Sequence, residues 1–193
     1  MKIGLFFGSF NPIHIGHLII ANTMLENTDL DQIWFVVSPQ NPFKKSKALL
    51  HEFDRYEIVQ RAINDNYNFK VCDAEFHLPR PSYTIDTLTY LQEKHKDHEF
   101  ALIIGEDNLV QFPQWKNYDK ILEYFSLYVY PRPGSQSNDL KNHSKVKMVP
   151  APILDISATY IRECVKNKKS IRYLVPEAVE NYIVQKGFYI SIK

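Results

Sequence analysis

The ten residues GSFNPIHIGH, from Gly8 to His17, follow the apolar run Lys2–Phe7 near the start of the chain. Glycine, proline and small polar residues favour a turn, and this turn lies where a buried strand would pass into a helix. His14 and His17 are three residues apart, so they share one face of that helix. Four interpretations are open: a metal site, an acid–base pair, a phosphate clamp, or polar residues without a chemical role.

Strand-like segments rich in β-branched and aromatic residues recur along the chain, and most are almost continuously apolar, as expected of strands buried on both faces. The predicted strands are Ile3–Phe7, Gln32–Val37, Phe69–Cys72, Glu99–Ile104, Ser126–Tyr130 and, more weakly, Val146–Val149. Segments with a helical period alternate with them, for example the apolar stripe Ile85, Leu88 and Leu91. This alternation predicts an α/β fold, a Rossmann-like, doubly wound parallel sheet.

The C-terminal part differs, because it reads as two consecutive helices, Asp155–Val165 and Pro176–Lys186. We place Pro176 at the first helical position and Gly187 at the C-terminal cap. The sequence therefore predicts one domain over residues 1–193. It comprises a nucleotide-binding α/β core over 1–150 and a small helical C-terminal subdomain over 151–193.

The composition is that of an ordinary globular protein, with 193 residues, 45% hydrophobic and 23% charged. A net charge of +1 gives no strong field for nucleic acid or an anionic membrane, and we expect neither as a partner. No apolar run reaches the roughly 20 residues of a membrane span, and no signal-peptide layout is seen. With only two cysteines and no CxxC spacing, we predict a cytoplasmic protein with reduced thiols.

The two histidines fit a phosphate clamp better than the other interpretations. A zinc site usually needs a third protein ligand, which is not evident, and a GxSxG nucleophile elbow is absent. GxGxxG after the first strand and a P-loop are absent as well. Gly8 and Ser9 let backbone N–H groups approach an anion, and a helix N-terminus favours phosphate.

The stretch GSFNPIHIGHL resembles the G-x-F-[DN]-P-x-H-x-G-H signature of the nucleotidyltransferase superfamily. Three further stretches resemble, in order and spacing, motifs of bacterial nicotinate-nucleotide adenylyltransferases. They are RPSYTIDTL (Arg80–Leu88), IGEDNLVQFPQW (Ile103–Trp115) and ISATYIRE (Ile156–Glu163). YPRPG and YLVPEAVENYI continue the likeness, so the resemblance covers essentially the whole chain.

This resemblance implies an enzyme that joins nicotinate mononucleotide to ATP, giving nicotinate adenine dinucleotide and pyrophosphate, in NAD biosynthesis. The mononucleotide phosphate would attack the α-phosphorus of ATP in line, without a covalent enzyme intermediate. Mg²⁺ would be held chiefly by the ATP phosphates and water, so we expect no metal site built from protein side chains.

The resemblance also implies the site residues. His14, His17 and Arg162 would be catalytic, acting on the charge of the phosphates. The ATP-binding set would be Gly8, Ser9, Phe10, His14, His17, Gly105, Asp107, Ser157, Thr159 and Arg162. Nicotinate mononucleotide would be bound by Lys44, Tyr83, Thr84, Trp115 and Arg132. In this set Trp115 would stack on the pyridine ring, and N–H groups near Tyr83 and Thr84 would take the nicotinate carboxylate.

Two departures from the family pattern stand out: Phe43 replaces a histidine of the usual PPHK, and Ala158 replaces the second serine of ISST. Other readings remain open at this point. They are adenylylation of nicotinamide mononucleotide, adenylylation of phosphopantetheine, and a nucleotide-binding regulator without catalysis. The sequence assigns no oligomeric state. His95 and His98, in a charged segment, are expected to be solvated.

Overall fold

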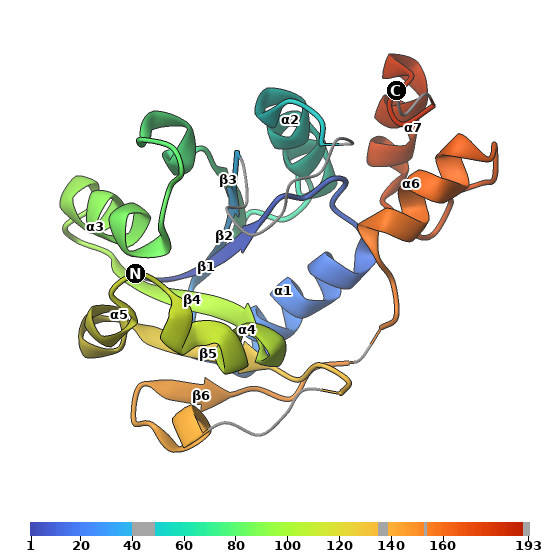
Figure 1. The fold of residues 1–193 in the computed structure, drawn as a ribbon. Helices are drawn as coiled ribbons and strands as arrows, with labels where there is room; N and C mark the ends of the chain where they lie inside the picture. Colours follow the sequence, from blue (N-terminus) through green and yellow to red (C-terminus); the bar gives the residue numbers. More distant parts are fainter. Residues whose placement is uncertain (40–48, 135–138, 153, 191–193) are drawn as a thin grey trace.

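The computed structural model describes residues 1–39, 49–134, 139–152 and 154–190. Its centre is a six-stranded, fully parallel sheet in the order β3-β2-β1-β4-β5-β6 (Figure 1). The strands are β1 (Lys2–Gly8), β2 (Gln32–Val37), β3 (Phe69–Cys72), β4 (Glu99–Gly105), β5 (Ser126–Tyr130) and β6 (Val146–Met148). This order is that of a doubly wound Rossmann-like sheet, so the predicted fold class is confirmed.

Helices cover both faces of the sheet. The α-helices are α1 (Ile15–Asn27), α2 (Glu52–Ala62), α3 (Thr84–Lys94), α4 (Glu106–Gln111), α5 (Tyr118–Tyr124), α6 (Ala158–Lys166) and α7 (Glu177–Lys186). The 3₁₀ turns within the described residues are η1 (Ala74–His77), η2 (Phe112–Gln114) and η3 (Asp139–Asn142). Buried residues of α1, α2, α6 and α7 form one core cluster with the sheet, and those of α3, α4 and α5 form the other.

The strands separate these two clusters by strict alternation. On β2, Ile33 and Phe35 belong to the first cluster, whereas Trp34 and Val36 belong to the second. Because successive side chains of a strand point to opposite faces, a strand covered on both sides reads as continuously apolar. This explains why the strands could be predicted from the sequence.

The two C-terminal helices start later than predicted. Helix α6 begins at Ala158 rather than Asp155, because the Ser157 hydroxyl caps it by accepting the Tyr160 N–H at 3.2 Å. Pro176 is the N-cap of α7 rather than its first helical residue. Gly187 ends α7 as predicted, with a left-handed φ of 65° that suits glycine.

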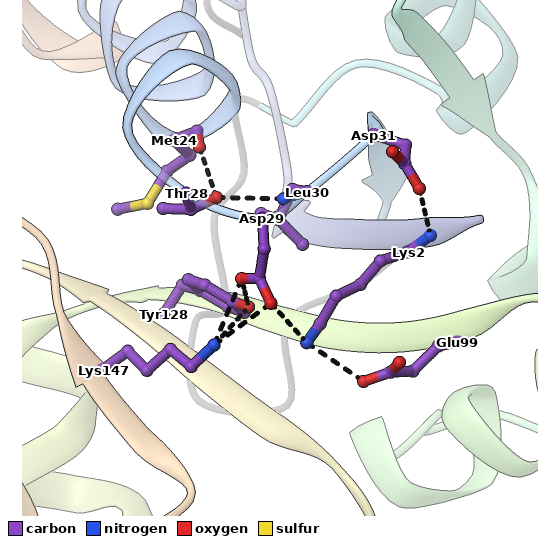
Figure 2. A network of polar contacts seen from close by, with 9 residues as sticks. All are labelled: Lys2, Met24, Thr28, Asp29, Leu30, Asp31, Glu99, Tyr128 and Lys147. Carbon is purple, nitrogen blue, oxygen red and sulfur yellow. Dashed lines mark hydrogen bonds and ion pairs between the residues drawn. The ribbon is translucent and has the colours of Figure 1, made fainter.

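The amino-terminal edge of the sheet carries a network of ionic contacts centred on Asp29 (Figure 2). The Asp29 carboxylate accepts hydrogen bonds from the Tyr128 hydroxyl, from Lys2 Nζ at 3.0 Å and from Lys147 Nζ at 3.1 Å. Lys2 Nζ also pairs with Glu99 at 3.1 Å. Residues of β1, β4, β5 and β6 are thus joined near the amino-terminal ends of the strands, opposite to the ends that carry the motif-bearing loops.

Candidate active site

A cavity opens at the carboxyl ends of β1 and β4, the two strands between which the strand order reverses. Ligands of doubly wound sheets bind at this switch point. The cavity is lined at the strand ends by Gly8 and Gly105, at the start of α3 by Tyr83 and Thr84, and after η2 by Trp115. Ser9 lines it as well. The structure thus brings six of the predicted site residues together around one cavity.

His14 and His17 lie at the start of α1, with His14 at its N-cap. Their ring centroids are 3.7 Å apart, with 33° between the ring planes. The His14 backbone N–H donates to His17 Nδ1 at 3.2 Å, which fixes the His17 ring over the first turn. The two imidazoles therefore form one rigid unit beside Phe6, a residue that lines the cavity.

Both imidazoles are neutral at pH 7. Burial lowers the pKa of His14 to about 4, and the Arg132 guanidinium adds to this effect. Burial also lowers the pKa of His17 well below its usual value, followed by the fields of His14 and Arg132. Since Nδ1 of His17 accepts a hydrogen bond, its ring proton resides on Nε2. His17 thus offers a neutral N–H donor rather than a fixed cation.

Two neighbours hold this histidine pair in place. A Cβ atom at Gly16 would come within 3.1 Å of His14 Nδ1, so only glycine leaves room for the ring in its present position. Phe10 is buried, with its ring centroid 5.2 Å from that of His17. Phe10, predicted to bind ATP, therefore packs against the His17 ring and supports it.

The start of α6 lies next to the start of α1. Ile156 approaches Gly16, and Arg162 Nη1 donates to the backbone carbonyl of Asn11 at 2.8 Å. Arg162 Nη2 also lies 3.1 Å from Thr159 Oγ1. Two helix N-termini, whose N-cap residues are His14 and Ser157, thus meet beside an arginine. Helix N-termini and arginine are both favourable partners for phosphate oxygens.

Arg132 and Asp107 lie on the β4–β5 side of the histidines. Arg132 Nε is 3.8 Å from Asp107 Oδ1, and its guanidinium lies over the Tyr130 ring, 5.5 Å from the centroid. The charge of Arg132 lowers the pKa of both histidines, although burial has the larger effect. The binding of Arg132 to the mononucleotide, which the resemblance implies, stays a prediction.

The RPSYT and FPQW segments line the cavity at the start of α3 and after η2. Tyr83 is the N-cap of α3, and the first N–H groups of a helix have no acceptor within it. The half-buried Trp115 packs at 5.1 Å from Phe112 and lines the cavity. Lys116 lines the cavity too, pairing with Asp86 at 3.0 Å, and its Nζ lies 4.5 Å from the centre of the Tyr83 ring.

The remaining predictions concern Lys44 and Phe43, a metal site, and the histidines His95 and His98. Lys44 and Phe43 lie outside the described residues. Within the part of the chain that the structure describes, no group of three or more His, Cys, Asp or Glu side chains could hold a metal ion. His95 and His98 are half-buried, not solvated, because their rings stack on each other and pack edge-on against Trp34.

Sequence reasoning missed several buried polar residues around the cavity. Arg55 of α2 is fully buried and donates to the carbonyls of Ser9 at 2.6 Å, Ser38 at 2.7 Å and Pro39 at 2.9 Å. Burial lowers its pKa to about 10, so it stays charged and ties together the loops after β1 and β2. Glu75, buried in η1, lines the cavity with Ser38 and Ser82. No spacing in the sequence singles these residues out.

No helix of the described residues is long and apolar enough to cross a membrane.

Comparison with known proteins shows the family. The cytidylyltransferase-like family model matches residues 5–164. A protein of Cytophaga hutchinsonii named "Probable nicotinate-nucleotide adenylyltransferase" is 62% identical over 189 residues, covering 98% of each chain. A protein of the same name from Flavobacterium psychrophilum is 52% identical over 191 residues, covering 98% of this chain and 99% of its own.

Solved structures share the fold. The nicotinic acid mononucleotide adenylyltransferase of Plasmodium falciparum, solved in complex with NaAD, superposes with a TM-score of 0.81 at 20% identity, covering 98% of this chain and 97% of that one. The structure of a "Putative Nicotinate-nucleotide Adenylyltransferase" from Vibrio parahaemolyticus gives a TM-score of 0.72, also at 20% identity, covering 97% of this chain and 94% of that one.

Proposed function

The chain belongs to the nicotinate-nucleotide adenylyltransferases within the cytidylyltransferase-like family, and from this premise we propose how its cleft carries out the reaction. As a nucleotidyltransferase of NAD biosynthesis, it would join nicotinate mononucleotide and ATP. One observation carries the proposal: the GSFNPIHIGH loop and the start of α6 meet at one end of the site, while the RPSYT and FPQW segments form the other.

The proposed chemistry is a single displacement. A phosphate oxygen of nicotinate mononucleotide forms a bond to the α-phosphorus of ATP, while the bond from that phosphorus to the bridging oxygen of the β-phosphate breaks. Pyrophosphate leaves with the electron pair, and nicotinate adenine dinucleotide is the other product. Such a transfer asks the protein mainly to position the two phosphates and to stabilise charge that moves onto the leaving group.

The triphosphate would lie over the meeting point of α1 and α6. His17 would donate its Nε2–H to a phosphate oxygen without needing to be charged, and His14 would pack beside it. Arg162 and the N–H groups after Ser157 would take the pyrophosphate. Arg132, whose charge also acts on the histidines, would bind nicotinate mononucleotide, as the resemblance implies. Gly105, the last residue of β4, and Asp107, in the first turn of α4, would border the adenosine.

Nicotinate mononucleotide would occupy the other end of the cleft. Trp115 offers a flat face for the pyridine ring, and the N–H groups at the start of α3, near Tyr83 and Thr84, suit its carboxylate. Lys116 adds a positive charge at this end. The proposed role of Lys44 at the mononucleotide phosphate rests on the sequence alone.

Mg²⁺ fits this site as a companion of ATP. The described side chains form no cluster of three metal ligands, whereas Mg²⁺ commonly keeps phosphate and water oxygens as its ligands. When bound, the ion would neutralise charge on the β- and γ-phosphates. We further propose that the enzyme works in the cytoplasm on small-molecule substrates without nucleic acid; its oligomeric state is left open.

The test is release of pyrophosphate from ATP and Mg²⁺, with nicotinate mononucleotide and nicotinamide mononucleotide compared side by side. We expect turnover with the acid and a higher kcat/KM for the acid than for the amide. A higher kcat/KM for the amide would overturn the substrate assignment. No turnover with either would point to phosphopantetheine, which is the third substrate to add, or to a nucleotide-binding regulator if that is inert as well.

A further inference from the structure

Glu75 is a buried carboxyl group in a cleft that must receive anionic substrates. It lies in η1, the short turn after β3, with 4% of its surface exposed, and it lines the cavity close to Ser82, Tyr83 and Thr84. A negative charge at this place repels the carboxylate of a pyridine substrate unless other groups of the protein bind the Glu75 carboxyl group. The contacts of Glu75 show which groups do so.

Three hydroxyl groups from three segments surround this carboxylate. Thr87 Oγ1, on α3, lies 3.1 Å from Glu75 Oε1. The hydroxyls of Ser38, after β2, and Ser82, before α3, hydrogen-bond the same carboxyl group. Hydrogen bonds to an ionised acceptor are stronger than those between neutral groups. One side chain therefore joins the end of β2, the segment before α3 and α3 itself.

The contact also reaches the proposed carboxylate-binding segment. Thr87 Oγ1 lies 3.3 Å from the backbone carbonyl of Tyr83, so its single proton is shared between Tyr83 and Glu75. Ser82, bonded to Glu75, directly precedes Tyr83. Burial raises the pKa of Glu75, and the three hydroxyls oppose this rise by stabilising the ionised form. The polar groups are thus mutually satisfied although they are buried.

We propose that Glu75 is a positioning residue, which holds the Ser82–Thr84 segment in the conformation that binds the pyridine end of nicotinate mononucleotide. It acts through the hydroxyls of Ser38, Ser82 and Thr87 and does not touch the reacting phosphates. This inference rests on the proposed function, because it assumes that this end of the cleft takes the mononucleotide. It predicts that variants of Glu75 and its partners weaken binding of nicotinate mononucleotide but not of ATP. It also predicts that they change the segment around the start of α3 but not α1 and α6.

The chain offers a closely matched pair of variants. Thr87 and Thr89 both lie on α3, and each hydroxyl approaches the carbonyl four residues before it, at 3.3 Å and 2.9 Å. Thr87 is buried and contacts Glu75, whereas Thr89 is exposed. Thr87→Val should raise KM for nicotinate mononucleotide about tenfold, the loss expected for one hydrogen bond to a charged group. KM for ATP and kcat should change by less than about threefold. Thr89→Val should match the wild type in both KM values and in kcat.

A second set of variants tests Glu75 itself. Glu75→Gln keeps an acceptor oxygen for the hydroxyls, so it should retain more affinity for nicotinate mononucleotide than Glu75→Ala. Ser82→Ala gives an independent variant of one of the donors. Hydrogen–deuterium exchange of residues 82–87 supplies a readout that needs no turnover. Exchange should be faster in Thr87→Val than in Thr89→Val, while exchange in α1 and α6 stays unchanged.

The outcomes separate this inference from the proposed function. Equal KM values for nicotinate mononucleotide in Thr87→Val and Thr89→Val would overturn it. So would an equal rise of KM for both substrates, which is expected if Thr87 serves only general stability. A wild type inactive with nicotinate mononucleotide would overturn the function, and the exchange experiment would then still decide whether Glu75 positions residues 82–84.

Discussion

His17 is held through one ring nitrogen, which leaves Nε2 as the donor of the ring. Its Nδ1 accepts the His14 backbone N–H at 3.2 Å, and its ring packs against Phe10. Because burial keeps the imidazole neutral, the proton on Nε2 remains as a directed hydrogen-bond donor. This geometry favours a clamp that recognises phosphate by position, and it answers which of the four initial interpretations the two histidines support.

Two substitutions test the roles of the two ring nitrogens of His17 separately. His17→Asn keeps an acceptor for the His14 N–H but loses the distant donor, so kcat should fall by about 10²–10³-fold, as for loss of a donor to a transition-state oxyanion. His17→Gln places an N–H near the Nε2 position and should retain more activity. Pyrophosphate release measures both, with thermal unfolding to confirm that the variants are folded. Wild-type activity of His17→Asn would contradict the clamp.

The histidines also predict a pH dependence of stability. In the unfolded chain they titrate near 6.5, whereas in the folded protein the pKa of His14 is about 4 and that of His17 is lowered as well. Between these values the unfolded chain binds more protons, so stability is full above about pH 6.5 and is lost as the pH falls toward 4. His14→Gln should remove this loss in part, by on the order of 2 kcal/mol at pH 5 relative to the wild type.

Urea unfolding of wild type and His14→Gln at pH 7 and pH 5 measures the difference. The free energy of unfolding of the wild type should drop more between the two pH values than that of the variant. Equal drops would contradict the burial of a neutral His14. By the same reasoning, kcat/KM should show no inflexion near pH 6.5 from these imidazoles.

At the scale of single residues, the sequence revealed groups that belong to local motifs. The loop pattern around His14 and His17 and the proline-interrupted segment before Trp115 predicted residues that the structure places at or beside the cavity. Glu75 and Arg55 were missed, because their roles depend on contacts between segments far apart in the chain. A buried charge has no signature in the sequence until the fold encloses it.

Among the elements, the start of α6 connects stability to the proposed phosphate site. Ser157 caps this helix through the Tyr160 N–H. Ser157→Ala should lower the free energy of unfolding by about 1 kcal/mol, the usual effect of losing an N-cap. Ser157→Asp should restore the cap, but its negative charge should raise KM for ATP at least tenfold if the pyrophosphate lies there.

Urea unfolding and steady-state kinetics of the two variants provide the measurement. The expected result is that stability and activity separate: the aspartate variant is as stable as the wild type and binds ATP poorly. Unchanged KM for ATP in Ser157→Asp would contradict the placement of the phosphates at α6.

A comparison of predicted with observed bounds shows what the sequence could predict about helices and strands. All six strands were predicted to within one residue at each end, and most of them are almost continuously apolar because they are covered on both faces. The start of α6 was predicted three residues too early, since a helical pattern extends past the point where a side chain takes over the N–H groups. The sequence predicted a doubly wound parallel sheet but not the order of its strands, because order and register arise from packing of distant segments.

For the whole molecule, the two ends of the strands differ in function. The cleft lies at the carboxyl ends of the strands, and the Asp29 network lies toward their amino ends (Figure 2). The hydrogen bond from Tyr128, with those from Lys2 and Lys147, holds the pKa of Asp29 well below its usual range despite partial burial. The network therefore stabilises the fold above about pH 4 and is lost as the pH falls below that value.

Asp29→Asn should lower the free energy of unfolding by about 1 kcal/mol, since the carboxylate is half-exposed and screened by solvent. The effect should shrink in 1 M salt, and KM for both substrates should stay unchanged, because the network lies far from the cleft along the strands. Unfolding at low and high salt, combined with kinetics, tests this. A change in KM without a change in stability would contradict the separation of tasks.

The stereochemical course at the α-phosphorus tests the central claim most directly, namely that the histidines position phosphates for one direct transfer. ATP carrying a sulfur of defined configuration on the α-phosphate would be converted with nicotinate mononucleotide, and the configuration of the dinucleotide product determined. One in-line displacement predicts inversion. Retention would mean two displacements through an adenylylated side chain, and His14 and His17 would then be candidate nucleophiles rather than a clamp.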